Sequence, residues 1–151
     1  MIQLSQKEKM LLQDQKSQEE ICVIKYQKYS QQAQDSQLKQ LFNTLSTEEQ
    51  QHLNTVNQML QGQEPNMGQT QQQENVPQVN AQGLAGNADD KMLCSDLLST
   101  EKYVSGTYDV AIFEAVNPSV RQALQHIQQD EQRHGEMIFN YMHTHGMYNV
   151  Q

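Results

Sequence analysis

The sequence predicts an all-α protein, a four-helix bundle made of two helical hairpins joined by a long crossover linker. Three observations predict this fold class. Apolar side chains recur every three or four residues in four long segments, which is the spacing of a helix buried along one face. The pattern of the first half returns in the second half at a constant offset of 82 positions. A polar stretch at residues 62–89, rich in Gln, Asn, Gly and Pro, separates the two halves.

The first two helices are expected at residues 5–34 and 36–61. Ser5 and Glu8 have the spacing of a capping box, in which a hydroxyl and a carboxylate bond the free N–H groups of the first turn. Asp35 interrupts the helical pattern and can cap the second helix, and a glycine follows that helix. The shared face of the first helix carries Leu12, Gln15, Glu19, Cys22, Tyr26, Tyr29 and Ala33.

The third helix is expected to begin after a cap at Asn87 or Asp89 and to reach about Val116. Asn117 and Pro118 then mark a boundary, because Asn caps helices and Pro fits the first helical turn. The fourth helix is expected to reach about residue 145. The chain is thus predicted to be one domain, with hairpins at residues 1–61 and 90–151.

The linker predicts how the hairpins are connected. One hairpin cannot bury its apolar stripe alone, so the two must pack together. Helices of about 27 residues are roughly 40 Å long, and a linker of about 28 residues spans up to about 90 Å when extended. An up-down-up-down bundle needs only a short loop. The long linker therefore favours a crossover along the whole bundle.

Composition excludes several functions. The net charge of −8 and the pI of about 5.0 argue against binding nucleic acid or an anionic membrane surface. The longest apolar runs are far shorter than a membrane helix of about 20 residues, and the N-terminus lacks the apolar stretch of a signal peptide. We expect synthesis in the cytoplasm without a signal peptide. Cys22 and Cys94 are expected to be reduced core residues, with a disulfide as the alternative.

Each half carries a glutamate on its first helix and a Glu-x-x-His motif on its second, all on otherwise apolar faces. Two-fold symmetry would bring these side chains to one level inside the bundle. The six residues are Glu19, Glu49, His52, Glu101, Glu131 and His134. Four carboxylates and two imidazoles are the ligand set of a carboxylate-bridged pair of metal ions. Oxygen and nitrogen donors favour iron or manganese, so we expect two divalent metal ions as cofactors.

A charge argument supports this expectation, because four buried carboxylates would repel one another unless cations neutralised them. Four cationic residues lie nearby in sequence, but their helical phase predicts that they point outward: Lys25, Lys28, Lys102 and Arg133. Tyr26 and Tyr108 share the face of the glutamates and could hydrogen-bond the ligating carboxylates. The alternative is a bundle without metal, in which the six residues form a hydrogen-bonded polar core. The other histidines, at positions 126, 143 and 145, are expected at the surface or near the end of the chain.

The second half resembles a known family. The resemblance lies in the segment from Asp90 to Tyr103, in Tyr108 to Glu114, in Asn117-Pro-Ser-Val-Arg121, in Asp130-Glu-Gln-Arg-His134 and in Ile138 to Tyr148. These residues are similar to the Coat F domain, which is found in spore coat proteins of endospore-forming bacteria. The resemblance is close over about residues 88–150, and the first half looks like a more divergent part of the same proteins. Met147 stands where the family pattern has Trp, which concerns packing of the tail and not the expected site.

A wider resemblance, carried by Glu-x6-Tyr and the paired Glu-x-x-His motifs, is to the ferritin-like superfamily, which includes the rubrerythrins. It implies a ferritin-like fold and implies that the six residues named above are metal ligands. The Cys-rich iron module of rubrerythrins is absent from this sequence. That departure argues against peroxide reduction of the rubrerythrin type, because the site at which electrons enter is missing.

Three functions remain open. The first is a structural or protective component of the bacterial endospore coat, with other coat proteins as partners; the family resemblance implies this function and this location. The second is a di-iron or di-manganese oxidase, peroxidase or ferroxidase acting in the cytoplasm or the spore, so enzymatic activity stays an open question. The third is a cytoplasmic metal-binding protein without turnover. A homodimer is compatible with a bundle of this kind, but no interface can be identified in the sequence.

Overall fold

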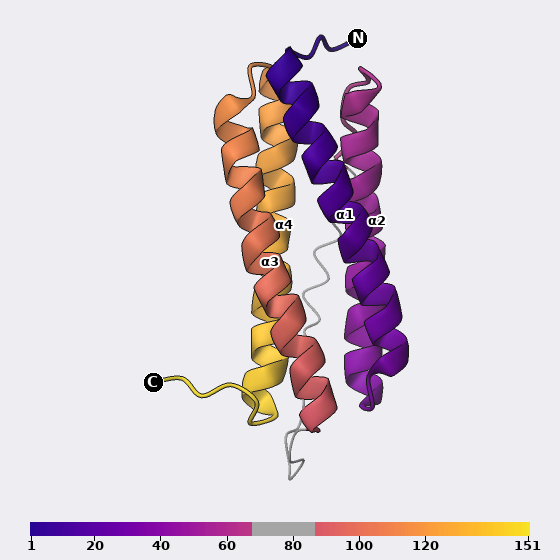
Figure 1. The fold of residues 1–151 in the computed structure, drawn as a ribbon, viewed down its shortest axis with the longest axis vertical. Helices are drawn as coiled ribbons and strands as arrows, with labels where there is room; N and C mark the ends of the chain where they lie inside the picture. The colour runs from indigo at the N-terminus through magenta and orange to yellow at the C-terminus, as the bar shows by residue number, and fades with distance from the viewer. Residues whose placement is uncertain (68–86) are drawn as a thin grey trace.

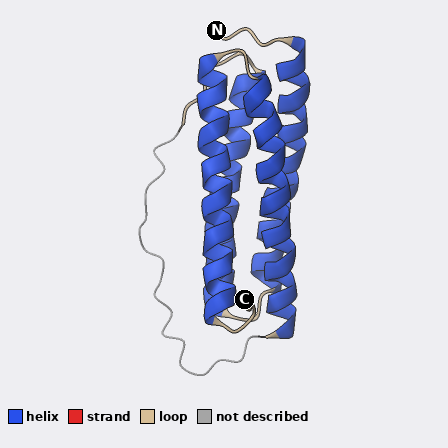
Figure 2. Cartoon of the chain, turned by 90° about the vertical axis from the view of Figure 1, so that its left-hand side faces the viewer, coloured by secondary structure: helices blue, strands red, loops and turns tan. Residues whose placement is uncertain are grey.

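The computed structural model describes residues 1–67 and 87–151. Four helices pack side by side with their axes along the length of the molecule (Figures 1 and 2): α1 (Gln6–Gln32), α2 (Ser36–Leu60), α3 (Ala88–Glu114) and α4 (Pro118–Thr144). The described ranges contain no β-strand. The prediction of an all-helical chain with four helices is confirmed. No helix among the described residues is long and apolar enough to span a membrane.

The helices begin where their capping residues predict. Ser5 and Glu8 form the expected capping box: the Glu8 amide donates to Ser5 Oγ over 3.1 Å, and the Ser5 amide donates to Glu8 Oε2 over 2.7 Å. Asp35, Asn87 and Asn117 cap the other three helices through their side-chain oxygens. Each cap satisfies N–H groups that have no partner within the helix.

Helices α1 and α3 each end two residues earlier than predicted. The backbone is already extended at Ala33 (φ −57°, ψ 140°) and at Ala115 (φ −70°, ψ 119°). The reason is that the next helix begins almost at once, so the chain must reach the extended N-cap conformation within two or three residues. At the other ends of the hairpins, Gly62 and Gly146 adopt positive φ angles of 76° and 68° and close α2 and α4.

Contacts at the two ends of the bundle fix its connectivity. The Ile2 amide donates to the carbonyl of Gly62 over 3.0 Å, so α2 ends beside the N-terminus. Asp90, in the first turn of α3, accepts hydrogen bonds from the amides of Gln34 and Asp35 in the α1–α2 turn. The end of α2 and the beginning of α3 therefore lie at opposite ends of the bundle (Figure 1), as a crossover requires. Most of the expected linker falls on residues 68–86, outside the described residues.

The apolar core divides into two clusters, one toward each end of the bundle. The cluster around Leu12, Val56 and Leu124 contains Cys22, and the cluster around Phe42, Leu97 and Ile138 contains Cys94. Both cysteines are buried free thiols. The residues between the clusters are buried and polar, and they hold the candidate site.

Candidate metal centre

The structure brings the six predicted site residues together in a buried layer near the middle of the bundle. Each helix contributes: Glu19 from α1, Glu49 and His52 from α2, Glu101 from α3, and Glu131 and His134 from α4. All six residues are buried, none with more than 4% of its whole surface exposed. Burying polar and charged groups this deeply lowers the stability of the fold, unless the groups are paired or bind a cation.

The donor atoms form two overlapping groups of four. One group contains Glu19 and His52, and the other contains Glu101 and His134. Glu49 and Glu131 belong to both groups. Within each group, one ligand atom from every residue lies within 4.8 Å of all the others. The layer thus contains two neighbouring groups of donor atoms that could each hold a cation and that share two carboxylates.

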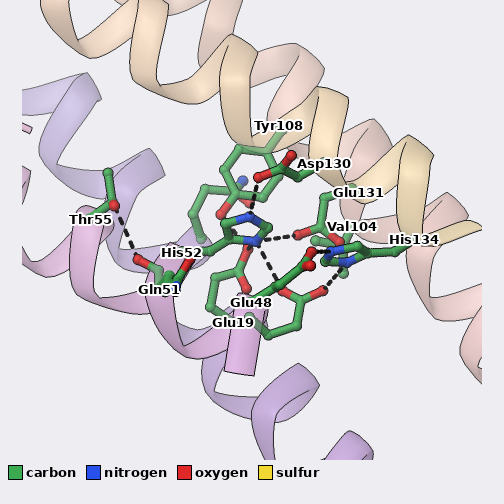
Figure 3. Close-up of polar contacts among 12 residues, drawn as sticks. Glu19, Glu48, Gln51, His52, Thr55, Val104, Tyr108, Asp130, Glu131 and His134 are labelled. Carbon is green, nitrogen blue, oxygen red and sulfur yellow. Dashed lines mark hydrogen bonds and ion pairs between the residues drawn. The ribbon is translucent and has the colours of Figure 1, made fainter. Parts of the chain in front are cut away.

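The imidazoles present one nitrogen inward and one outward. His52 Nδ1 lies 3.2 Å from Glu49 Oε2 and 3.0 Å from Glu131 Oε1, and His134 Nδ1 lies 3.0 Å from Glu49 Oε1. The inner nitrogens therefore face the shared carboxylates. Figure 3 shows His52 among these side chains, and the two rings stack with centroids 5.6 Å apart.

The outer nitrogens contact two carboxylates that the sequence analysis missed. His52 Nε2 lies 2.9 Å from Asp130 Oδ2, and His134 Nε2 lies 2.6 Å from Glu48 Oε2. In a neutral imidazole, a carboxylate on the outer nitrogen holds the proton there, which leaves the inner nitrogen available to a metal ion. The signal was present in the sequence, because residues 48 and 130 are 82 positions apart and each precedes a site glutamate.

The two tyrosines bond the glutamates as expected, but each reaches across to the other hairpin. Tyr26 Oη donates to Glu101 Oε1 over 2.5 Å, and Tyr108 Oη donates to Glu19 Oε1 over 2.5 Å. Burial raises both tyrosine pKa values well above the ordinary range, and the nearby carboxylates raise them further. The phenols therefore stay protonated and act as hydrogen-bond donors.

Three buried carboxylate oxygens have no hydrogen-bond partner among the described residues: Oε2 of Glu19, Glu101 and Glu131. Buried polar atoms are nearly always paired, so three such oxygens in one layer need an explanation. All three belong to the overlapping donor groups. The residues present therefore fit a pair of divalent cations, which would bind these oxygens.

The comparisons with known proteins concern the second hairpin. Residues 89–151 match the family model of the Coat F domain. The match covers nearly all of α3 and α4, so we call these helices the Coat F hairpin, and it does not reach α1 or α2. No curated protein and no solved structure matched the chain.

The Coat F hairpin supplies three of the six residues of the layer. The pKa shifts of the glutamates and His134 show how the residues of the two hairpins interact electrostatically. Burial, followed by the charge of Glu49, raises the pKa values of Glu19 and Glu131 well above the usual glutamate range. Burial also opposes ionisation of Glu49, but bonds from Glu19 and both histidines outweigh it and hold its pKa well below that range. Burial disfavours the His134 cation, yet Glu101 and the other carboxylates raise its pKa well above the usual value. The raised pKa values of Glu19, Glu131 and His134 all favour their protonated forms.

One of the four cationic residues does not lie as predicted. Lys28 and Lys102 are exposed, and Lys25 bonds Asp96 and Thr100 away from the site. Arg133 of the Coat F hairpin instead bends toward the layer. Its Nη2 donates to Glu48 Oε2 over 2.5 Å and lies 3.5 Å from Asp130 Oδ1. The prediction from helical phase was wrong here, because a long side chain can turn sideways along the helix surface.

The remaining histidines lie outside the six-residue layer. His145 is buried rather than exposed, with its ring stacked on Tyr141 and its Nδ1 2.8 Å from the Tyr141 carbonyl. His143 stacks on Phe139. His126 Nε2 lies 3.6 Å from Asp130 Oδ2, at the outer edge of the candidate centre.

Proposed function

We propose that this chain is a component of the bacterial endospore coat and that its bundle holds two divalent metal ions. The Coat F match over residues 89–151 supports the coat role. The observation that carries the metal proposal is the pair of overlapping four-residue donor groups that share two glutamates. Neither part depends on the other, so they are tested separately.

In this proposal Glu49 and Glu131, which belong to both donor groups, would help to hold both ions. Glu19 and His52 complete one position, and Glu101 and His134 complete the other. The histidines bind through Nδ1, because Nδ1 faces the glutamates and Nε2 faces an outer carboxylate. Carboxylate and imidazole donors without thiolate suit iron or manganese.

The surrounding residues prepare the site for binding. Glu48 and Asp130 fix the orientation and tautomer of the two imidazoles. Tyr26 and Tyr108 orient Glu101 and Glu19 by holding one oxygen of each, which leaves the other oxygen for a cation. The apolar clusters on both sides keep bulk water away from the layer.

We further propose that the fold is ferritin-like and arose by duplication of one hairpin. Helix α3 begins and ends 82 positions after α1, and α4 begins 82 positions after α2. The bonds across the layer repeat with the same offset, since Tyr26–Glu101 corresponds to Tyr108–Glu19. A duplicated hairpin explains why both sets of contacts cross between the hairpins.

A second candidate function is a di-iron or di-manganese oxidase, peroxidase or ferroxidase. The observation that favours it is the pair of buried tyrosine hydroxyls bonded to site carboxylates. Iron or manganese, when bound, would supply redox chemistry with oxygen or peroxide. Oxidation of added ferrous iron, followed by the absorbance of ferric product, tests this function. If the wild type oxidises no more ferrous iron than Glu49→Ala does, the chain binds metal without turnover.

The coat role is tested in sporulating cells. An antibody against the chain should label the surface layers of the spore, and extraction of the coat should release the protein together with other coat proteins. A cytoplasmic protein made in the same cells serves as the control for incomplete washing. Signal confined to the cytoplasm of the mother cell or the spore core would contradict the coat role and leave the metal proposal standing.

A further inference from the structure

A surface pocket lies between α2 and α4, directly outside His52. Its lining consists of Gln51, His52, Thr55, Met67, Ala123, His126, Ile127 and Asp130. Asp130 Oδ2 lies between two imidazoles, 2.9 Å from His52 Nε2 and 3.6 Å from His126 Nε2. Figure 3 shows Asp130 above His52, with Gln51 and Thr55 beside it. The pocket thus connects the surface with a ligand of the proposed centre, and it is lined by groups that bind metal ions.

The equivalent place on the other half of the bundle is built differently. Thr44 stands where the pocket has His126, and Arg133 stands where the pocket has Gln51, each pair being 82 positions apart. The Arg133 guanidinium contacts Glu48 and lies 3.6 Å from Met137 Sδ. Behind it, the side chain of His134 is 0% exposed, whereas that of His52 is 6% exposed.

The charges around the two histidines also favour approach of a cation from the His52 side. On the His134 side, Arg133 Nη2 bonds Glu48 Oε2 over 2.5 Å, so its guanidinium repels a cation that approaches there. The same nitrogen lies farther from Asp130 Oδ1, at 3.5 Å, and Asp130 directs its other oxygen, Oδ2, to His52 and His126. A cation that approaches His52 meets the Asp130 carboxylate and the His126 imidazole, an oxygen and a nitrogen donor suited to first-row transition metals. His52, which lines the pocket, belongs to the same donor group as Glu19 and Glu131, each of which has an oxygen without a hydrogen-bond partner among the described residues.

We propose that His126 and Asp130 form a weak outer site for a divalent transition-metal cation, and that metal ions reach the buried layer through this pocket. The ions pass beside His52 and not beside His134. This inference rests on the proposed metal centre, and it adds the side from which that centre is loaded. Two donors hold a cation less firmly than the four of an inner position, so the outer site passes ions inward and does not store them.

The test is the rate at which the full chain, stripped of metal by chelation, takes up Co²⁺. Bound Co²⁺ is followed by its visible absorbance after rapid mixing at low metal concentration, and the final cobalt content is measured separately. His126→Thr copies the equivalent residue of the other half, and Gln51→Arg places a guanidinium at the pocket. Thr44→Ala, on the equivalent side, is the matched control. Circular dichroism checks that all variants are folded.

We expect both pocket variants to take up Co²⁺ more slowly, on the order of tenfold, because His126→Thr removes a donor and Gln51→Arg adds a charge that repels the cation. Their final cobalt content should equal that of the wild type, and Thr44→Ala should change neither quantity. Unchanged uptake rates in both pocket variants, with full final loading, would overturn the inference and leave the metal centre intact. A wild-type chain that takes up no Co²⁺ would overturn the metal centre itself, and the inference with it.

Discussion

Glu8 and Asp90 stand 82 positions apart, and each carboxylate accepts backbone hydrogen bonds from the turn of the other hairpin. Glu8 Oε1 accepts from the amides of Val116 and Asn117 over 2.8 and 3.1 Å. Asp90 accepts from the amides of the α1–α2 turn over 2.7 and 3.0 Å. At each end of the bundle, one buried carboxylate therefore connects the two hairpins by hydrogen bonds. These bonds fix the register of one hairpin against the other.

This arrangement predicts a pH-dependent effect of Glu8→Gln. Burial raises the pKa of Glu8, but bonds from three backbone amides and the Ser5 hydroxyl outweigh it, so the pKa lies below its ordinary value of 4.5. A group with a lowered folded-state pKa adds stability above its unfolded pKa and loses it as the pH falls through the folded-state pKa. We predict that Glu8→Gln lowers the free energy of unfolding by about 1–3 kcal/mol at pH 7. The difference should shrink below about pH 4, where the wild-type carboxyl also becomes protonated.

Urea unfolding of metal-free protein at several pH values checks this prediction. Glu20→Gln is the control, because the side chain of Glu20 is 50% exposed on the same helix. If Glu8→Gln lowers the free energy of unfolding by the same amount from pH 7 to pH 3, the charge of Glu8 does not stabilise the contact with the α3–α4 turn.

The crossed tyrosine bonds predict an effect on metal affinity. Tyr108→Phe and Tyr26→Phe each remove a hydroxyl that orients a site glutamate. We expect each variant to bind Mn²⁺ or Co²⁺ about tenfold more weakly, because groups that position metal ligands contribute at this scale. Tyr29→Phe is the matched control, since Tyr29 Oη bonds Asp96 outside the layer. Equal affinity in all three variants would contradict the positioning role of Tyr26 and Tyr108.

Metal binding should also stabilise the fold. Because Glu49 belongs to both donor groups, Glu49→Ala should damage both positions at once. At a metal concentration about 100 times the dissociation constant, binding adds about 2.7 kcal/mol, which corresponds to a rise in Tm of roughly 5–10 °C for a chain of this size. We predict that Mn²⁺ raises the Tm of the wild type and not that of Glu49→Ala. If Glu49→Ala instead melts at the same or a higher temperature than the wild type with Mn²⁺ present, the layer is a polar core without metal.

The two thiols should be unreactive in the folded chain. Burial raises the pKa of Cys94 to about 12, and the Asp90 carboxylate adds to the shift. Burial and the site glutamates raise the pKa of Cys22 further. Since only the thiolate reacts, iodoacetamide at pH 8 should leave the native protein unmodified, and both thiols should react once urea unfolds it. Mass spectrometry counts the modifications, and rapid labelling of the native chain would contradict this prediction.

The sequence predicted the helices, their caps and the six residues of the layer, because each depends on local spacing. Glu19 and Glu49 were identified by helical phase, which says which face of a helix a residue occupies. Phase does not say which residue lies opposite on the next helix. The crossing of Tyr26 to Glu101 and of Glu8 to the α3–α4 turn therefore could not be derived, although the constant offset hinted at matching pairs.

The errors have a common physical cause. Glu48 and Asp130 occupy positions beside the apolar stripe, and only the packing of α2 against α4 brings them to the outer histidine nitrogens. Arg133 was expected to point outward, but its flexible side chain reaches Glu48 on α2 and Asp130 one turn earlier on α4. The contacts of side chains at the border of a helix face depend on how the neighbouring helix packs there. A single sequence does not describe that packing.

The most direct test of the metal centre is the metal content of the chain purified without chelators, measured by elemental mass spectrometry. The Glu49→Ala, His134→Ala double variant removes a shared ligand and a histidine, and Glu20→Ala serves as the exposed control. We predict about two iron or manganese ions per chain in the wild type and in Glu20→Ala, and a loss of both ions in the double variant. Less than about 0.2 metal ions per wild-type chain, even after reconstitution with ferrous iron, would contradict the metal centre, since folding should provide the complete site.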